Sequence, residues 1–359
     1  MPEVGVLLVN TGSPDELTVP AIKNYLERFL MDPRIRPMPR LPWSLILHRR
    51  ILPTRPAALL EKYRTIWTPE GSPLIAAHRR LAEKLAAHFD ERRVPAAVRF
   101  AMSYSEPSIR GALDELAGAG CARVVVLPLY PQSAFSTTGA VTDAVRKAAK
   151  RVKPRIAIDI VENYHDDPCY LKAIARSVVD AGFEPDSTDR LVFSFHSIPL
   201  TDIEAGDTYE LQIGASCLAI AEELGLDRRR WTIGYQSQFD RDRTWLSPFT
   251  RQTLSAWAEQ AIEDRLFIVC PNFAADGLET LYDIDGVLRD EYLAQRRAHD
   301  PHARGAHAPA NAGLADEDAF TYVPCLNDSD AHVAVIEHVL APHLGIACDA
   351  ADEANERRG

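Results

Sequence analysis

Short apolar runs rich in β-branched residues alternate along the chain with segments whose apolar residues recur every three or four positions. The runs predict buried strands, and the longer period predicts amphipathic helices. Because the two alternate, we expect parallel sheets whose strands are connected by helices. The predicted strands are Val4–Asn10, Val98–Tyr104, Arg123–Leu129, Ile156–Val161, Arg190–Ser194, Trp231–Tyr235 and Arg265–Cys270. The predicted helices include Leu74–Arg92, Ser108–Ala117, Thr138–Ala149, Cys169–Ala181, Tyr209–Leu224 and Thr250–Glu259.

The ends of the predicted strands repeat, which indicates an internal duplication. Two strands precede a turn with serine and proline, and two others run into a proline followed by an aromatic residue. The first pair is Val6–Pro14 and Leu191–Pro199, and the second is Arg123–Ala134 and Arg265–Ala275. This order predicts two similar halves that face each other across a cleft. We place the domains at 1–165 and 166–328, a C-terminal helix that packs back on the core at 329–345, and a flexible tail at 346–359.

Two segments depart from this plan. Residues 33–60 contain six arginines, no acidic residue and an apolar stretch around Trp43. They predict a lip that binds a flat apolar anion or a membrane surface, with a helix of merely solvated arginines as the alternative. Residues 295–318 lack periodicity and predict a surface loop. Its histidines, which we do not expect to be ligands, are His299, His302 and His307.

The bulk composition narrows the class of protein. The chain has 359 residues, 46% of them hydrophobic and 25% charged, which is typical of a globular protein with two domains. Its net charge of −11 argues against nucleic acid as a partner, because phosphate binding needs a basic surface. No long apolar span or cleavable leader is evident, so we expect a cytoplasmic protein. The six cysteines form no C-x-x-C pair, which argues against a zinc site, a disulfide framework and an iron–sulfur cluster.

His196 is the first candidate for chemistry. It follows the apolar run Leu191–Phe195 and precedes Ser197-Ile198-Pro199, so it lies where a strand ends. Ligands bind at this end of the strands in open α/β sheets, and imidazole both titrates near neutral pH and binds metals. The alternative is a core histidine that is hydrogen-bonded to a loop carbonyl.

Two carboxylates follow the last predicted strand. If Gly277-Leu278-Glu279-Thr280 begins a helix, Glu279 and Asp283 share one face near its start, where the helix dipole favours negative charge. Together with His196, these carboxylates would bind a divalent cation first through their oxygens and then through the imidazole. An exposed acidic first turn is the alternative.

A series of short motifs covers nearly the whole chain. They are Leu7–Pro14, Tyr25–Arg34, Tyr63–Trp67 with Gly71–Leu74, Leu127–Gln132 with Ser136–Gly139, Ser194–Pro199, Gly206–Gln212, Tyr235–Ser237 with Trp245–Pro248, and Ala275–Leu281. In this order they resemble the ferrochelatases, which insert ferrous iron into a porphyrin to make haem. Asn272 and Gly277 are unusual residues for the last part of this pattern.

The resemblance implies two Rossmann-like, chelatase-type domains with the porphyrin between them. His196 and Glu279 match the family's active-site histidine and glutamate, which it assigns to iron binding and proton removal. We expect His196 to act as base, iron ligand or both in succession, Glu279 as catalytic carboxylate and ligand, and Asp283 as a secondary ligand. The expected porphyrin contacts are Thr11, Ser13, Arg34, Trp43, Tyr130 and Trp245.

The substrate expectation rests on the lip at 33–60, which resembles that of the protoporphyrin-using enzymes that visit membranes. We expect protoporphyrin IX and Fe²⁺ as substrates in the last step of haem biosynthesis, no cofactor beyond the substrate Fe²⁺, and peripheral membrane contact through 33–60. Coproporphyrin III as substrate, a related cobalt or nickel tetrapyrrole chelatase, and a non-catalytic metal or haem carrier are the alternatives.

Overall fold

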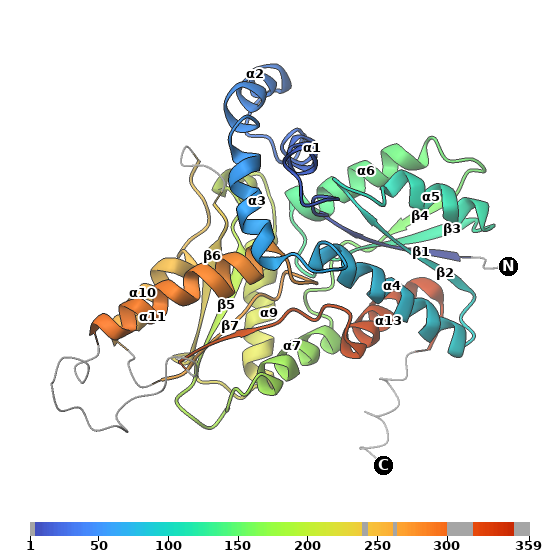
Figure 1. The fold of residues 1–359 in the computed structure, drawn as a ribbon. Coiled ribbons are helices and arrows are strands. Elements are labelled where there is room, and N and C mark those ends of the chain that lie inside the picture. The colour runs from blue at the N-terminus through green and yellow to red at the C-terminus, as the bar shows by residue number, and fades with distance from the viewer. Residues whose placement is uncertain (1–3, 239–242, 261–263, 300–318, 348–359) are drawn as a thin grey trace, which may run out of the picture. The chain divides into compact units, whose positions relative to one another are not determined.

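A computed structural model describes residues 4–238, 243–260, 264–299 and 319–347 (Figure 1). The chain divides into two compact units. Unit 1 comprises Met1–Tyr170 with Leu326–Gly359, and unit 2 comprises Leu171–Cys325. The predicted tail, apart from Ile346 and Ala347, lies outside the described residues.

Unit 1 is built on a parallel sheet of four strands in the order β2-β1-β3-β4. The strands are β1 (Val4–Asn10), β2 (Ala96–Met102), β3 (Arg123–Pro128) and β4 (Ala157–Ile160). The helices that follow the strands include α4 (Pro73–Glu91), α5 (Ile109–Gly118) and α6 (Ala140–Ala149), the last preceded by the π-helical turn η2 (Phe135–Gly139). Apolar residues of β1, β3, α5 and α6 form one core cluster. The sheet and its crossover helices confirm the predicted α/β class for this half.

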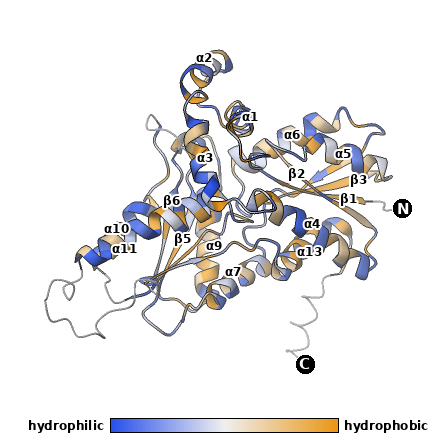
Figure 2. Cartoon of the chain, in the orientation of Figure 1, coloured by the Kyte–Doolittle hydropathy of each residue, from blue (hydrophilic) through white to orange (hydrophobic). Residues whose placement is uncertain are grey.

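Unit 2 repeats the topology with the strand order β6-β5-β7-β8, again all parallel. The strands are β5 (Arg190–His196), β6 (Trp231–Gln236), β7 (Leu266–Val269) and β8 (Phe320–Val323). In both sheets the first strand of the unit is central and pairs with the second and the third, so the duplication seen in the strand ends extends to the strand order. Figure 2 shows the strands of both sheets mainly in hydrophobic colours, as expected where helices cover a sheet.

The helices of unit 2, within its described residues, precede, connect or follow these strands. They are α7 (Pro168–Asp180), which begins in unit 1, α8 (Leu200–Glu204), α9 (Tyr209–Glu223), α10 (Thr250–Gln260), the π-helix η3 (Leu278–Leu288) and α11 (Arg289–His299). The prediction of a loop from 295 onward was wrong at its start, because α11 continues to His299. His302 and His307 lie outside the described residues.

The C-terminal helix α13 (Asp330–Leu344) belongs to unit 1, where it contacts α4 and β3. Ser329 caps its start by accepting a hydrogen bond from the backbone N–H of His332, and Gly345 ends it with a φ of 68°. The side chain of Glu337 is buried against α4, where His88 and Arg92 both bond to it. Paired charges of this kind hold α13 on unit 1.

The arginine-rich segment of unit 1 is helical. After α1 (Val19–Leu30) come α2 (Arg40–Ile46), the π-helical turn η1 (Leu47–Ile51) and α3 (Arg55–Ile66). Trp43, expected to contact the porphyrin, points inward: it is 9% exposed, and its indole N–H donates to the carbonyl of Leu30 at 2.6 Å. Trp43 therefore holds α2 against α1, and the large apolar residues that α2 exposes are Leu41 and Leu45.

Candidate active site

His196 is the last residue of β5, the central strand of the unit 2 sheet. Two hydrogen bonds of the next residue, Ser197, hold the main chain around it. Ser197 N donates to the carbonyl of Gln236 at 2.8 Å, and Ser197 Oγ donates to the carbonyl of Leu246 at 2.9 Å. The imidazole is therefore held at the carboxyl edge of the sheet, where ligands of open α/β sheets bind.

The imidazole of His196 has a defined tautomer. Its Nδ1 lies 2.7 Å from the carbonyl oxygen of Ser197, which can only accept, so Nδ1 carries the proton. The other nitrogen, Nε2, then presents its lone pair in the neutral ring. Burial lowers the pKa of His196 below its ordinary value, although the bond to Ser197 opposes this shift. His196 is thus neutral near pH 7 and able to take up a proton or a metal ion.

A chain of hydrogen bonds connects the end of β5 with the segment after β7. The Tyr209 hydroxyl, at the start of α9, donates to the carbonyl of His196 at 3.0 Å. Asn272 in turn donates from Nδ2 to the Tyr209 oxygen at 3.2 Å. Because Asn272 belongs to the segment between β7 and η3, His196 and the chain that carries Glu279 are connected within unit 2.

The beginning of η3 is held by Asp276. This buried carboxylate accepts hydrogen bonds from the Thr280 hydroxyl at 3.0 Å and from the Tyr322 hydroxyl of β8 at 2.6 Å, both at Oδ1. Thr280 Oγ1 also accepts from the backbone N–H of Gly277 at 3.0 Å. These bonds fix where the helix starts and so where Glu279, in its first turn, can lie.

The helix that carries Glu279 and Asp283 differs from the α-helix predicted from sequence. It is a π-helix of 11 residues, a form that occurs often at functional sites. Its i→i+5 bonds give a wider turn than the bonds of an α-helix. The buried residues Thr280, Ile284 and Leu288 lie four residues apart. Glu279 and Asp283, both half-buried, each come one residue before a buried residue of this set and are themselves four residues apart.

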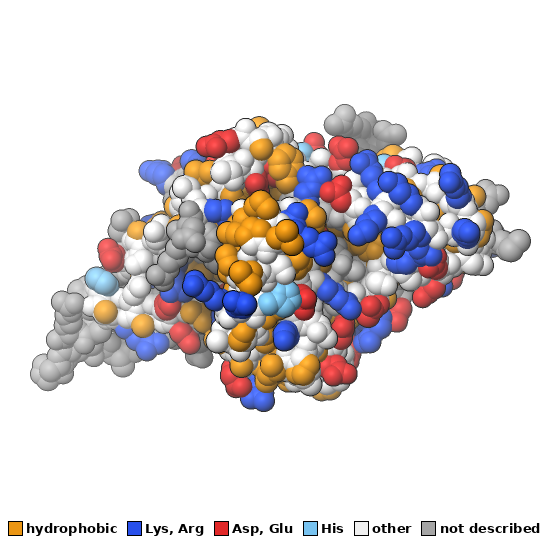
Figure 3. All heavy atoms as spheres, turned by 90° about the horizontal axis from the view of Figure 1, so that it is seen from above, with side chains coloured by type: hydrophobic (Ala, Val, Ile, Leu, Met, Phe, Trp, Pro, Cys, Tyr) orange, Lys and Arg blue, Asp and Glu red, His pale blue; other side chains and the backbone are white. Residues whose placement is uncertain are grey.

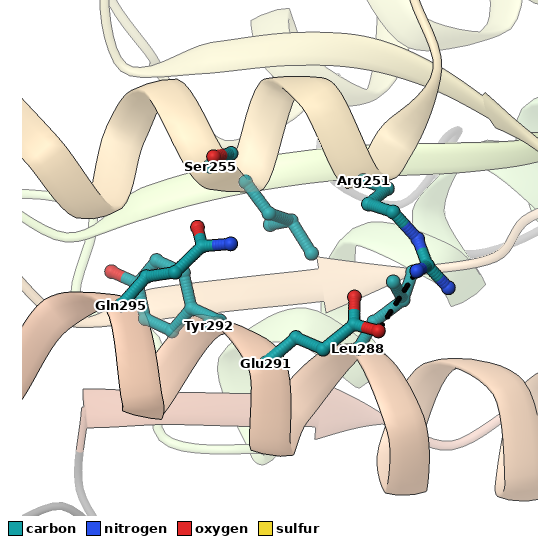
Figure 4. A pocket seen from close by; sticks show the side chains of 7 residues that line it. Arg251, Ser255, Leu288, Glu291, Tyr292 and Gln295 are labelled. Atoms are coloured by element: carbon teal, nitrogen blue, oxygen red, sulfur yellow. Dashed lines mark hydrogen bonds and ion pairs between the residues drawn. The ribbon is translucent and has the colours of Figure 1, made fainter.

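The expected metal ligands stay a prediction. Among the residues that the structure describes, no three His, Cys, Asp or Glu side chains are grouped closely enough to hold a metal ion. A small cavity does lie between α10 and α11, lined by Arg251, Tyr292 and Gln295 among others (Figure 4). Its volume of about 10 Å³ accommodates about one water molecule, so it does not bind a porphyrin.

Unit 1 brings three of the expected porphyrin contacts to the carboxyl edge of its own sheet. Thr11 follows β1 and Tyr130 follows β3, and their hydroxyls lie 2.5 Å apart. Between Thr11 and Ser13, Gly12 has a φ of 101°, and a Cβ there would lie 2.3 Å from the Ser105 hydroxyl, so only glycine fits. Ser13 is buried, and nothing among the described side chains and backbone groups bonds to its hydroxyl.

Arg34 and Trp245 have neighbours within their own units. The guanidinium of Arg34 lies 2.8 Å from Asp143 and 5.9 Å from the ring centre of Phe135, so an incoming carboxylate would compete with Asp143. Trp245 is buried in unit 2, with the guanidinium of Arg243 4.7 Å from its ring centre. The roles of Tyr209 and Asn272 were not predicted from sequence, because a hydroxyl and an amide on separate segments carry no common pattern.

The fold, two α/β units that each contain a four-stranded parallel sheet, is similar to the folds of two solved proteins. SirB from Bacillus subtilis, solved with Fe³⁺, superposes with a TM-score of 0.53 at 12% identity, covering 97% of this chain and all of SirB. DR2241 from Deinococcus radiodurans, described as similar to chelatases, superposes with a TM-score of 0.51 at 13% identity, covering 95% of this chain and 55% of that protein.

The sequence comparisons identify the family. The Ferrochelatase family model matches residues 3–344. The ferrochelatase of Methylibium petroleiphilum is 39% identical, covering 94% of this chain and 87% of that protein. The ferrochelatase of Haemophilus influenzae is 36% identical, and the match covers 95% of this chain and 98% of that protein. The chain belongs to the ferrochelatase family, and it is an enzyme that inserts a metal ion into a porphyrin for haem synthesis.

Proposed function

We propose that this ferrochelatase inserts Fe²⁺ into protoporphyrin IX with release of two protons, the last step of haem biosynthesis. The observation that carries the proposal is the imidazole of His196 at the carboxyl edge of β5, hydrogen-bonded through Nδ1 to the carbonyl of Ser197. The reaction needs such a group to take pyrrole protons and to receive a metal ion. No cofactor beyond the substrate Fe²⁺ is part of the proposal.

The chemistry of metal insertion suggests a role for three residues of unit 2, namely His196, Glu279 and Asp283. A porphyrin is metallated when its two pyrrole protons leave and the cation sheds its water, so a base and replacement ligands are both required. His196 Nε2 accepts a pyrrole proton, for which general-base catalysis contributes about 10²–10⁴-fold. Glu279 supplies a carboxylate ligand or proton acceptor, and Asp283 is the next oxygen ligand along η3. Imidazole and carboxylate bind later divalent metals at least as well as Fe²⁺.

The porphyrin contacts of unit 1 are part of the same proposal. The hydroxyl pair of Thr11 and Tyr130 and the buried hydroxyl of Ser13 offer hydrogen bonds at the carboxyl edge of the sheet. Arg34 is proposed to bind a propionate in exchange for Asp143, since both partners are carboxylates and the existing ion pair is exposed to water. Trp245 is proposed as an aromatic contact from unit 2.

The substrate assignment is tested by anaerobic assays of the purified protein with protoporphyrin IX and Fe²⁺, Zn²⁺ or Co²⁺. We expect many turnovers with all three ions, seen as the change from free-base to metalloporphyrin absorption bands. The same assay with coproporphyrin III is expected to give a lower kcat/KM. A higher kcat/KM with coproporphyrin III would reverse the assignment. Turnover of sirohydrochlorin alone would favour a cobalt or nickel chelatase, and a stoichiometric spectral shift would favour a carrier.

A peripheral membrane contact is proposed for α2 and η1, on the cytoplasmic side of the membrane. Leu41 and Leu45 are 84% and 54% exposed and lie four residues apart on α2, so they share one face. Exposed arginines accompany them at Arg40, Arg49 and Arg50. Figure 3 views the molecule from above Figure 1, the side on which α2 lies in that figure. It shows a cluster of hydrophobic side chains with Lys, Arg and His side chains beside it. Such a surface suits anionic lipid headgroups over an apolar boundary.

None of the described helices is long and apolar enough to cross a membrane. Sedimentation with liposomes tests the peripheral contact. We expect the wild-type protein to sediment with vesicles that contain anionic lipid and to be released by high salt. Leu41→Asp with Leu45→Asp should lower the affinity for these vesicles by about 10²-fold or more, because each leucine loses apolar burial worth about 1.5–3 kcal/mol and each 1.4 kcal/mol is about tenfold in affinity.

The matched control for the liposome experiment is Leu211→Asp with Leu218→Asp. These leucines are 74% and 52% exposed on α9, so the control pair changes exposure and charge by similar amounts. The control should bind vesicles as the wild type does. Equal binding by both double variants, or loss of binding in the control alone, would contradict a contact through α2.

A further inference from the structure

Asn272 lies in the segment between the end of β7 and the start of η3, next to Pro271 and Phe273. Its side chain makes the second of the two hydrogen bonds that connect this segment to His196. Asn272 therefore contacts Tyr209, the residue that bonds to the backbone of the proposed catalytic base.

The direction of both hydrogen bonds follows from the chemistry of the groups. The carbonyl of His196 can only accept, so the single hydroxyl proton of Tyr209 points to it. The Tyr209 oxygen then has only lone pairs for Asn272, which must offer its Nδ2 donor. Neither bond can be reversed without breaking the other. The pair therefore acts as one chain, from Asn272 through Tyr209 to the backbone of His196.

The carbonyl oxygen of the Asn272 amide, Oδ1, indicates that the side chain serves as a hydrogen-bond donor. This oxygen is buried, and no donor among the described residues bonds to it. A buried acceptor without a partner destabilises a fold by about 1–3 kcal/mol. An apolar residue of similar size would avoid this cost, so the donor half of the amide is the part that the local structure uses.

We propose that Asn272 is a positioning residue for metal insertion, which acts through Tyr209 to hold the backbone of His196. The inference rests on the proposed function of His196. By holding the carbonyl of His196, the chain sets the position from which the imidazole Nε2 meets the pyrrole nitrogens. A misplacement of about 1 Å can cost about 10²-fold in rate, so a single bond in the support can matter.

The main test is a double-mutant cycle of Asn272→Ala and Tyr209→Phe in the full-length protein. Each single variant is expected to lower kcat for zinc insertion by about three- to tenfold, the effect of one neutral hydrogen bond. The porphyrin KM should stay within about twofold. Because both changes break the same chain, the double variant should be no slower than Tyr209→Phe alone. Rate losses that simply multiply would overturn the proposal.

Asn272→Asp separates positioning from packing. Aspartate has nearly the same shape, but it accepts where asparagine donates, so it draws the Tyr209 proton away from the carbonyl of His196. We expect Asn272→Asp to be at least as slow as Asn272→Ala. If packing were the only role, Asn272→Asp would keep the wild-type kcat, and that result would contradict the inference.

Two further variants identify which proposal fails if the results differ. Tyr292→Phe removes a hydroxyl from another buried tyrosine of unit 2, on α11, and should leave kcat unchanged. Near-normal activity in His196→Ala would refute the proposed function itself. Loss of activity in His196→Ala together with multiplying losses in the cycle would refute only the role of Asn272. Thermal unfolding of each variant checks that the fold is retained.

Discussion

Replacement of His196 by alanine is expected to lower metal insertion by about 10²–10⁴-fold, the usual contribution of a general base. The alanine variant lacks the Nε2 lone pair that accepts the pyrrole proton. The support around it stays intact, because Ser197 still donates to the carbonyls of Gln236 and Leu246, and Tyr209 still donates to the backbone carbonyl of residue 196. Initial rates of zinc insertion into protoporphyrin IX, followed by absorbance, measure the effect.

The control for this prediction is His299→Ala, which removes an exposed histidine at the end of α11 in the same unit. It should keep the wild-type rate. Porphyrin binding by His196→Ala, measured by fluorescence quenching, should stay close to that of the wild type, since the imidazole acts on the reaction more than on ring binding. An alanine variant that inserts zinc at near-normal rates would remove His196 from the mechanism.

Glu279→Gln is expected to lower metal insertion by about 10²-fold or more, because it keeps the shape of the side chain but removes its charge and its proton affinity. If the carboxylate is chiefly a ligand, the KM for the metal ion rises. If it is chiefly a proton acceptor, kcat falls and the metal KM stays near that of the wild type. Steady-state kinetics over a range of Zn²⁺ concentrations distinguish the two roles.

Asp290→Asn is the matched control for Glu279→Gln. Asp290 is exposed at the start of α11, immediately after η3, so the substitution neutralises a nearby acidic side chain without touching the π-helix. Its kcat and metal KM should equal those of the wild type. A wild-type kcat and metal KM in Glu279→Gln would show that the carboxylate takes no part in insertion.

Most of the sheet structure was predictable from the hydrophobic pattern alone. The predicted strands at 4–10, 123–129 and 231–235 agree with β1, β3 and β6 to within one residue. Long buried strands between helices must be apolar on both faces, so their runs stand out from the rest of the sequence. β8 (Phe320–Val323) was not predicted; it closely follows residues 295–318, which lack periodicity and were interpreted as a loop.

The form of the helix after β7 was not predictable from the same pattern. The apolar residues Leu278, Leu281, Ile284 and Leu288 suit an α-helix as well as the π-helix that is observed. The start of the helix is held by the hydrogen bonds of Asp276 with Thr280 and with Tyr322, the second of which joins positions 46 residues apart. Local periodicity does not contain a contact of that range.

The sequence by itself determined the α/β class, the duplicated halves and His196 at a strand end, because burial of apolar runs and the position of a polar residue after them are local properties. Tertiary structure alone decided how that histidine is supported. The tautomer of His196, the chain through Tyr209 to Asn272, the π-helix beneath Glu279 and the inward Trp43 all depend on groups far apart in sequence. Hydrogen bonds between distant segments form only when packing brings their donors and acceptors within reach.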